Sequence, residues 1–268
     1  MIAPCTVRSL PAVAAATTGS AARPWLPSLL ALGLVAWASA ARPADEPAAL
    51  FSITPVRPVT ELRPLALAAK PPVESGDFRP ADLVELSKLD PTLRLDIRYA
   101  TTRNFLGVPL YSQARAFLQR PAAEALVRVQ RSLAAEGYGL IVYDAYRPWY
   151  VTKMFWDATP PDLHRFVADP AEGSRHNRGC AVDLSLYDLK TGRALSMPSA
   201  YDEMTERAYP EYGGGSAEER LRRDLLRRHM EAEGFTVYEF EWWHYDFHDW
   251  KSYAIQNVRF EDIRTGQP

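Results

Sequence analysis

Residues 174–186 read SRHNRGCAVDLSL, and the second half of this stretch alternates apolar side chains with polar or small ones. Successive side chains of a β-strand point to opposite faces of its sheet. We therefore predict a strand in which Val182 and Leu184 face the core while Asp183 projects from the other face. His176 lies in the preceding turn, and imidazole and carboxylate both suit a zinc ion. The stretch thus predicts half of a metal site.

A second stretch, residues 239–246, reads EFEWWHYD and offers the third ligand that a catalytic zinc site needs. His244 lies there in an aromatic, strand-like run. Glu241 precedes it by three residues and would take a proton from water and pass it to a leaving amine. In a regular strand these two side chains would face opposite ways. A bulge or turn at Trp242 and Trp243 is therefore required to bring them to one site.

Neither spacing is specific by itself. A histidine seven residues before an aspartate is common in proteins, and Glu-x-x-His on a strand is more often a surface pair than a metal site. The metal-site hypothesis therefore depends on the two stretches occurring together and on the rest of the chain.

The remaining sequence mixes helical patterns with short apolar runs. Residues 121–136 have proline in the first turn and apolar side chains at helical spacing, which predicts an amphipathic helix. Strands are predicted at 93–99, 140–143 and 237–247, and further helices at 150–157 and 217–233. Because these elements show no regular βαβ period, the pattern predicts the α+β class.

Length and composition indicate one globular domain with tails. The chain has 268 residues, of which 47% are hydrophobic and 24% are charged. Its formal net charge is −2, whereas nucleic-acid binding is typical of domains with a strongly basic surface. We therefore expect no nucleic-acid partner.

Residues 1–40 have the features of a secretory signal peptide. They contain arginines but no acidic residue, and an apolar run from Trp25 to Ala40 ends in Ala-Ser-Ala. We predict export to the periplasm, cleavage after Ala40, and no membrane span in the mature chain. The alternative is an uncleaved anchor, but this run of 16 residues is shorter than the roughly 20 that a spanning helix needs.

Residues 41–76 contain seven prolines and show neither a helical nor a strand period. Proline fixes φ and removes a backbone donor, so this composition predicts an extended tether. The alternative is that part of the segment packs on the domain as an irregular arm. The folded domain is expected over residues 77–265.

The combined pattern, Ser-x-His-x-x-Gly-x-Ala-x-Asp followed by Glu-x-x-His, resembles the LAS-type zinc peptidases. Within that group the chain is most similar to the D-alanyl-D-alanine dipeptidases of the VanX type. The segments that carry this narrower resemblance are Arg98–Thr101 with Asn104 and Phe105, Asp144–Pro148, Tyr201–Met204 and Glu241–Tyr245. The similarity runs from about residue 82 to about residue 249. It implies a single zinc-peptidase domain with a small central antiparallel sheet flanked by helices.

The resemblance also implies a role for each matching position. His176, Asp183 and His244 would bind one zinc ion per chain. Glu241 would act as general base and then as general acid. Arg147 would stabilise the oxyanion of the tetrahedral intermediate, since a fixed guanidinium aimed at developing negative charge lowers the barrier.

Three further positions follow from the same resemblance. Tyr99, Ser174 and Asp202 would belong to the substrate pocket, and Asp202 would recognise the free ammonium of a dipeptide. The residues alone leave other interpretations open. Tyr99 could be an ordinary strand aromatic, and Arg147 could pair with Asp144 on the surface.

The function implied is zinc-dependent hydrolysis of the D-alanyl-D-alanine dipeptide to two D-alanine in cell-wall peptide turnover, with the dipeptide as the partner. One alternative is a D,D-carboxypeptidase that acts on peptidoglycan stem peptides, whose groove would stay open where a dipeptidase pocket closes. Another is a non-catalytic metal-binding module for wall recognition. Such a module should tolerate the loss of Glu241 and Arg147, and both are present.

Overall fold

The computed structural model describes residues 50–264. The predicted signal peptide, its cleavage point after Ala40 and the first part of the predicted tether lie outside the described residues. Between residues 50 and 264, no helix is both long enough and apolar enough to cross a membrane.

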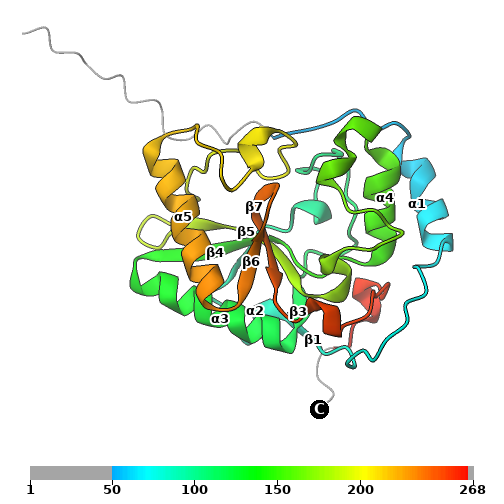
Figure 1. Ribbon diagram of the computed structural model, residues 1–268, viewed down its shortest axis with the longest axis horizontal. Coiled ribbons are helices and arrows are strands. Elements are labelled where there is room, and N and C mark those ends of the chain that lie inside the picture. Colours follow the sequence, from blue (N-terminus) through cyan, green and yellow to red (C-terminus); the bar gives the residue numbers. More distant parts are fainter. Residues whose placement is uncertain (1–49, 265–268) are drawn as a thin grey trace, which may run out of the picture. The chain divides into compact units, whose positions relative to one another are not determined.

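A five-stranded sheet forms the centre of the described domain (Figure 1). Its strand order is β2 (Arg94–Leu95), β4 (Tyr138–Asp144), β5 (Ala181–Asp188), β7 (Glu241–Phe247) and β6 (Phe235–Tyr238). Neighbouring strands are antiparallel, except that β2 pairs parallel with β4. A second, two-stranded antiparallel sheet joins β1 (Leu83–Glu85) and β3 (Phe117–Gln119). These sheets with their helices confirm the predicted α+β class.

Five α-helices accompany the sheets, and their bounds are α1 (Val59–Ala68), α2 (Leu86–Leu89), α3 (Arg120–Ala135), α4 (Trp149–Ala158) and α5 (Ala217–Ala232). Helices α3 and α5 pack against the central sheet and against each other, whereas α1 packs on α4 (Figure 1). The three longer helices predicted from the sequence are confirmed to within one or two residues. Helix α5 begins where Ser216 and Glu219 form reciprocal side-chain caps that satisfy free backbone N–H groups.

Short 3₁₀ turns complete the described chain: η1 (Arg98–Ala100), η2 (Pro161–Phe166), η3 (Arg175–Arg178), η4 (Glu206–Ala208), η5 (Trp250–Ser252) and η6 (Phe260–Asp262). Strand β5 has the predicted alternation, and Val182 and Leu184 are fully buried in the core. Asp183 on its other face is also buried, so that face is covered as well and needs polar partners.

The strand predicted over residues 93–99 is wrong beyond its first residues, because only β2 is extended and paired. The chain turns at η1, where the carbonyl of Tyr99 accepts hydrogen bonds from the N–H groups of Leu110 and Tyr111, at 2.7 and 2.9 Å. Ile97 and Tyr99 are both buried. Burial in the core, rather than pairing in a sheet, explains the apolar side chains that suggested a strand.

The prediction of an extended tether over residues 41–76 is wrong for residues 59–68, which form α1. Val59, Leu62 and Ala66 are buried at spacings of three and four residues, so one face of the helix packs on the domain. Pro64 lies inside this helix and removes one backbone hydrogen bond. Burial of the apolar face offsets that loss, which composition alone does not reveal.

Candidate metal and substrate site

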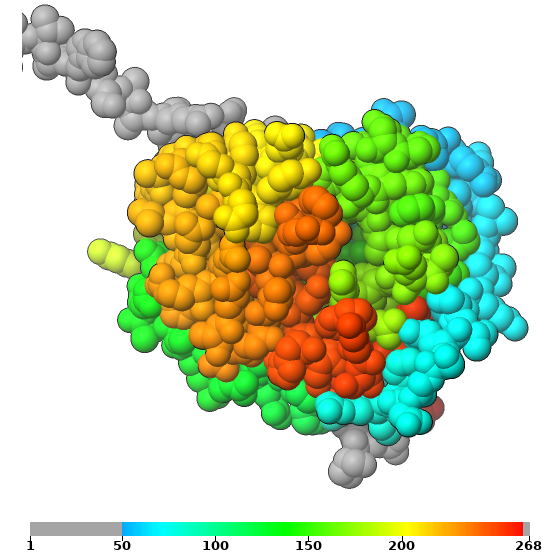
Figure 2. Space-filling model, viewed as in Figure 1, coloured from blue at the N-terminus to red at the C-terminus, as the bar shows by residue number. Residues whose placement is uncertain are grey.

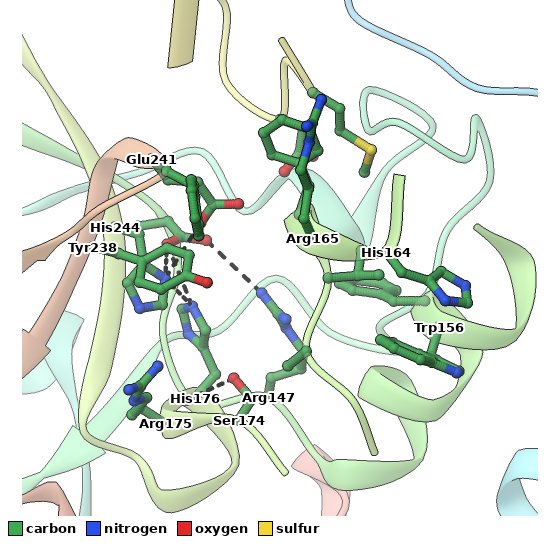
Figure 3. A pocket seen from close by; sticks show the side chains of 18 of the residues that line it. Arg147, Trp156, His164, Arg165, Ser174, Arg175, His176, Tyr238, Glu241 and His244 are labelled. Carbon is green, nitrogen blue, oxygen red and sulfur yellow. Dashed lines mark hydrogen bonds and ion pairs between the residues drawn. The ribbon is translucent and has the colours of Figure 1, made fainter. Parts of the chain in front are cut away.

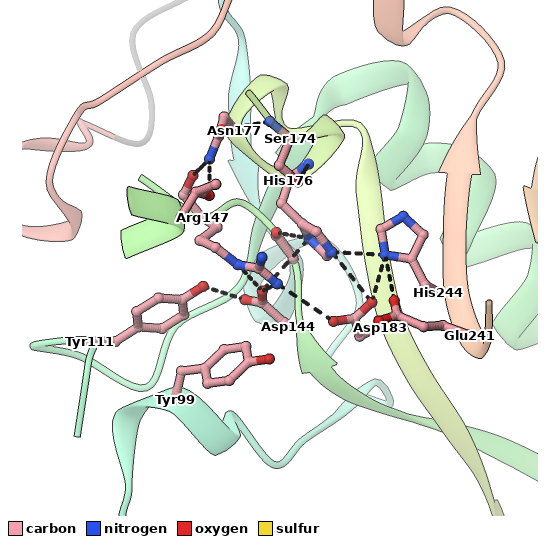
Figure 4. A network of polar contacts seen from close by, with 12 residues as sticks. Tyr99, Tyr111, Asp144, Arg147, Ser174, His176, Asn177, Asp183, Glu241 and His244 are labelled. Carbon is pink, nitrogen blue, oxygen red and sulfur yellow. Dashed lines mark hydrogen bonds and ion pairs between the residues drawn. The ribbon is translucent and has the colours of Figure 1, made fainter. Parts of the chain in front are cut away.

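Three predicted ligands converge within the described part of the chain (Figure 4). His176 Nε2 lies 3.1 Å from His244 Nδ1 and 3.3 Å from Asp183 Oδ1, and the latter two atoms are 3.1 Å apart. Ligands at zinc distances in a tetrahedral site are about 3.3 Å from one another. Asp183 Oδ1 is buried without a hydrogen-bond donor among the described residues. The donor set and its spacing therefore fit a zinc ion.

The sheet and one turn place these three atoms together. Asp183 and His244 are direct partners across the antiparallel β5–β7 pair, which brings their side chains to the same face of the sheet. His176 comes from η3, where Ser174 caps the first turn and Gly179 ends it with a φ of 70°. A left-handed residue at that point is the usual role of glycine. The chain then enters β5 two residues later.

The irregularity predicted near Trp242 and Trp243 is confirmed. In the β6–β7 pair, Val237 faces Tyr245, yet the next residue, Tyr238, faces Glu241. Three residues of β7 therefore have no opposite partner on β6. As a result Glu241 Oε2 lies 3.7 Å from His244 Nδ1, so the predicted base and the predicted ligand reach the same site despite their odd spacing.

Each ligand is held by a second hydrogen bond on its far side. His176 Nδ1 is 2.6 Å from the carbonyl oxygen of Ala145, and His244 Nε2 is 2.9 Å from Asp246 Oδ1. In the neutral imidazoles, with the proton on these outer nitrogens, the nitrogens that face the cluster carry lone pairs. The Tyr201 hydroxyl donates to Asp183 Oδ2 at 2.9 Å, which leaves Oδ1 for a metal.

The sequence prediction missed Tyr201, Asp246 and Ala145 as supports. A signal for two of them was available. Asp246 is two residues after His244 on the same strand, so the two side chains share a face. Tyr201 directly precedes the predicted pocket residue Asp202. Nothing in the local pattern marks the carbonyl of Ala145.

The charges of the cluster favour a bound cation. Burial opposes ionisation of Asp183, but the imidazoles of His176 and His244 lower its pKa well below the usual range. Burial likewise disfavours a charged His244, but Asp246 and Asp183 together raise its pKa to about 10. The buried Asp183 and the half-buried Asp246 thus stabilise positive charge at this position.

Glu241 stands at the edge of this cluster. Burial raises its pKa to about 8, and the negative charge of Asp183 adds to that rise while His244 opposes it. A pKa near the working pH suits a group that must take up a proton and later release it.

Arg147 pairs with Asp144, but not on the surface. Its Nε and Nη2 donate to Asp144 Oδ2 at 3.0 and 2.8 Å, and both side chains are buried. The Tyr111 hydroxyl donates to the other oxygen of Asp144 at 2.6 Å. Nη2 of Arg147 also lies 3.8 Å from Asp183 Oδ2. The ion pair therefore fixes the guanidinium beside the three candidate metal ligands, as Figure 4 shows.

Asp202 and Tyr99 meet at another part of the same cavity. The Tyr99 hydroxyl donates to Asp202 Oδ1 at 2.8 Å. The second oxygen, Oδ2, is buried and has no partner among the described residues. Burial raises the pKa of Asp202 to about 7, although the Tyr99 hydrogen bond opposes this rise. The backbone of Asp202 has a φ of 63°, a strained geometry often found at functional sites.

Ser174 lies on the cavity wall, and its oxygen accepts a hydrogen bond from the backbone N–H of His176 at 3.2 Å. The structure therefore gives this predicted substrate residue a capping role at the start of η3. Its hydroxyl proton is not used in that bond and can be donated to a ligand.

The predicted site residues all line one cavity of about 370 Å³, near the lower end of the roughly 300–1,000 Å³ found for ligand sites. Its mouth is the hollow in Figure 2 between the orange segment around β7 and the green segments that follow α4. Figure 3 shows Trp156 and His164 on the wall across from the metal ligands, with Arg147 between. The rings of Trp156 and His164 are stacked, with their centroids 3.8 Å apart. The sequence prediction did not identify this wall.

Comparison with known proteins agrees with this geometry. The peptidase M15 family model described as D-ala-D-ala dipeptidase matches residues 79–263. The D-alanyl-D-alanine dipeptidase of Escherichia coli (strain K12) is 35% identical over 179 residues, which cover 67% of this chain and 91% of that protein. The D-alanyl-D-alanine dipeptidase of Enterococcus faecalis is 40% identical over 179 residues, which cover 59% and 87%. That of Enterococcus faecium is 37% identical over 178 residues, with the same coverage.

Among solved structures, the LdcB LD-carboxypeptidase is 21% identical with a TM-score of 0.36, and the match covers 71% of this chain and 82% of that one. The family match spans most of the described domain, and the curated relatives are matched over most of their length. This chain is a peptidase and belongs to the D-Ala-D-Ala dipeptidase family of the M15 peptidases.

Proposed function

We propose that this chain is a zinc-dependent dipeptidase that hydrolyses D-alanyl-D-alanine to two D-alanine. One observation carries the proposal. A metal-ligand triangle, a half-buried glutamate, a fixed guanidinium and an unpartnered carboxylate oxygen line a single small cavity. The names of the relatives support the same substrate.

His176, Asp183 and His244 would hold the metal, and zinc is the proposed ion because nitrogen and carboxylate ligands at this spacing suit it. When bound, zinc supplies Lewis-acid chemistry that polarises a carbonyl oxygen and makes water more acidic. The remaining chemistry belongs to side chains of this protein.

Glu241 accepts the proton of the attacking water and then delivers it to the amine of the departing D-alanine. Burial and the negative charge of Asp183 raise the pKa of Glu241, which makes its carboxylate a stronger base for the first of these steps. Arg147 stabilises the negative charge that develops on the carbonyl oxygen. Because Asp144 holds the guanidinium from behind, Arg147 needs little rearrangement during the reaction.

Asp202 favours a free dipeptide over a longer peptide. Its buried Oδ2 lacks a donor among the described residues, and the ammonium group of a dipeptide would supply both a donor and a positive charge. A stem peptide has an uncharged amide at the same position, which cannot neutralise the carboxylate. The Tyr99 hydroxyl keeps Asp202 in place for this contact. The carboxypeptidase alternative is therefore less favoured.

The test is D-alanine release by the zinc-loaded protein from free D-Ala-D-Ala and, separately, from a stem pentapeptide that ends in it. We expect release from the dipeptide alone and its loss in Glu241→Ala. Release mainly from the pentapeptide would instead establish the carboxypeptidase. Retention of zinc without release from either substrate would establish the binding module.

We also propose that the protein acts in the periplasm, in cell-wall peptide turnover. The support is the sequence of residues 1–40, which has the order of a cleavable signal peptide. A reporter fused to residues 1–45 should be exported and shortened by cleavage. A reporter that stays in the cytoplasm would contradict the proposal.

A further inference from the structure

The N-terminal arm, defined as residues 50–78, precedes the family match that begins at residue 79. It is nevertheless bound to the walls of the cavity. The Ile53 N–H donates to the carbonyl of Phe105, and the Val56 N–H donates to the carbonyl of Ala158 at the end of α4, each at 2.9 Å. Phe105 lines the cavity. The arm therefore supports parts of the site that the family match contains.

Within the arm, Glu74 contacts the segment that carries the predicted metal ligand His176. Its Oε1 accepts a hydrogen bond from Arg178 Nη2 at 2.5 Å, and its Oε2 accepts one from the Ile255 N–H at 2.6 Å. The Glu74 side chain is 20% exposed and that of Arg178 only 10%. Arg178 Nη1 donates to the carbonyl of Tyr253 at 2.5 Å. Within residues 50–264, Glu74 is the one carboxylate that pairs with Arg178.

Arg178 belongs to the metal loop, defined as residues 174–180. It is the last residue of η3 and follows His176 by two residues. Its carbonyl accepts a hydrogen bond from Gln119 Nε2 at 2.9 Å, and the Gln256 N–H donates to the carbonyl of Asn177 at 3.0 Å. The loop is thus held by β3 on one side and by the C-terminal segment on another. Glu74 ties the loop to that segment, since it binds Arg178 and Ile255 together.

We propose that Glu74 is a positioning residue for the metal loop and acts through Arg178. The inference rests on the metal site of the proposed function. Without Glu74, the Arg178 guanidinium is left in the interior with no counter-charge, which proteins tolerate poorly. The loop then moves Arg178 toward solvent, and the His176 imidazole loses its fixed position. Loss of a partner hydrogen-bonded directly to a ligand typically weakens metal binding by about 10- to 100-fold, which sets the upper limit for Glu74, since it acts through Arg178.

The test compares Glu74→Gln with Glu61→Gln, a matched change on the same arm. Glu61 is 59% exposed and pairs with Arg57 on the surface at 3.6 Å. Two quantities are measured. The first is the rate at which Zn²⁺ passes from the loaded protein to an excess of a coloured chelator. The second is amide hydrogen exchange of residues 175–180 in the metal-free protein, with urea unfolding as the measure of global stability.

We expect Glu74→Gln to release zinc faster than the wild type, by up to about 10- to 100-fold. Its loop amides should show a larger increase in exchange rate than the amides of the rest of the domain. Glu61→Gln should match the wild type. Arg178→Gln should reproduce the effect, and the double variant should add nothing further. Should Glu74→Gln fail to fold, Glu74→Asp, which is one methylene shorter, replaces it with a smaller change expected in the same direction.

Wild-type zinc release and loop exchange in Glu74→Gln would overturn the inference. So would faster exchange spread evenly over the domain, since that reports lost stability alone. A wild-type protein that holds no zinc would remove the metal site of the proposed function. The loop exchange of the metal-free protein would still decide whether Glu74 orders residues 175–180.

Discussion

Asp202 has a strained backbone conformation, and one of its carboxylate oxygens is buried without a donor among the described residues. A hydrogen bond between charged groups contributes about 1.5–3 kcal/mol. Asp202→Asn should therefore lower kcat/KM for D-Ala-D-Ala by about 10- to 100-fold, mainly through KM. Steady-state kinetics with the free dipeptide and its N-acetyl form provide the check. Equal losses on both substrates would show that Asp202 does not contact the ammonium.

The pH dependence of KM is a separate prediction from the same residue. Burial raises the pKa of Asp202 to about 7, so the carboxylate becomes protonated as the pH falls through 7. The substrate ammonium loses its proton above about pH 8. KM should therefore be lowest between these values and should rise on both sides. In Asp202→Asn the acid side of this profile should disappear, and an unchanged acid side would contradict the assignment.

Tyr201 is a support that appears only in the structure. Its hydroxyl donates to Asp183 Oδ2 and leaves Oδ1 free for the metal. Tyr201→Phe should weaken zinc binding by about 10-fold or more while the fold is retained. Competition with a chelator measures the affinity. Tyr187→Phe is the matched control, because that hydroxyl is exposed and makes only a 3.4 Å contact with the carbonyl of Thr92.

At the scale of elements, the sequence indicates the site better than the arrangement of strands. The alternation in β5 and the odd Glu-x-x-His spacing in β7 were sufficient to predict that Asp183 projects away from the core face and that a bulge lies beside His244. Both are local consequences of a two-residue period. The pairing of β5 with β4 and β7 joins segments far apart in the sequence, and no local pattern encodes it.

The single strand predicted over residues 237–247 is in fact two antiparallel strands, β6 and β7, joined by a turn. The errors over residues 93–99 and 59–68 share another physical cause. Residues 93–99 have strand-like alternation and residues 59–68 have helix-breaking proline, yet tertiary burial decides both. Tyr99 turns inward at η1 and α1 forms because its apolar face is covered by α4. Most helical stability in proteins comes from such packing rather than from intrinsic propensity. A prediction based on composition therefore fails where a short segment docks on the core.

Helix α1 gives a direct test of this explanation. Leu62 is 1% exposed, whereas Leu65 on the same helix is 51% exposed. Leu62→Ala should lower the free energy of unfolding by about 2–5 kcal/mol, the usual range for a buried leucine. Leu65→Ala should change it by less than about 0.5 kcal/mol. Urea unfolding of the two variants measures both values. Similar values for the two would mean that α1 does not pack on the domain in solution.

Over the whole described domain, the site is assembled from segments that lie far apart in the sequence. The metal ligands come from η3, β5 and β7, the guanidinium follows β4, and Tyr99 lies in η1. The arm contacts the backbone of Phe105 and the end of α4, and through Glu74 it also contacts the metal loop. Because these contacts are spread along residues 53–74, the arm is a packed part of the folded domain rather than a linker that leads to it.

Truncated chains can distinguish an arm that packs on the domain from the extended tether predicted for residues 41–76. A chain that begins at residue 77 loses the buried side chains of Val59 and Leu62 and the Glu74–Arg178 pair. Burial of each such apolar side chain contributes about 1.5–3 kcal/mol, so this chain should unfold at a clearly lower urea concentration and should lose zinc faster. A chain that begins at residue 50 keeps all these contacts and should match the chain that begins at residue 41. Equal unfolding midpoints for the chains that begin at residues 50 and 77 would instead support the tether prediction, because a segment that only links two parts contributes nothing to the stability of either.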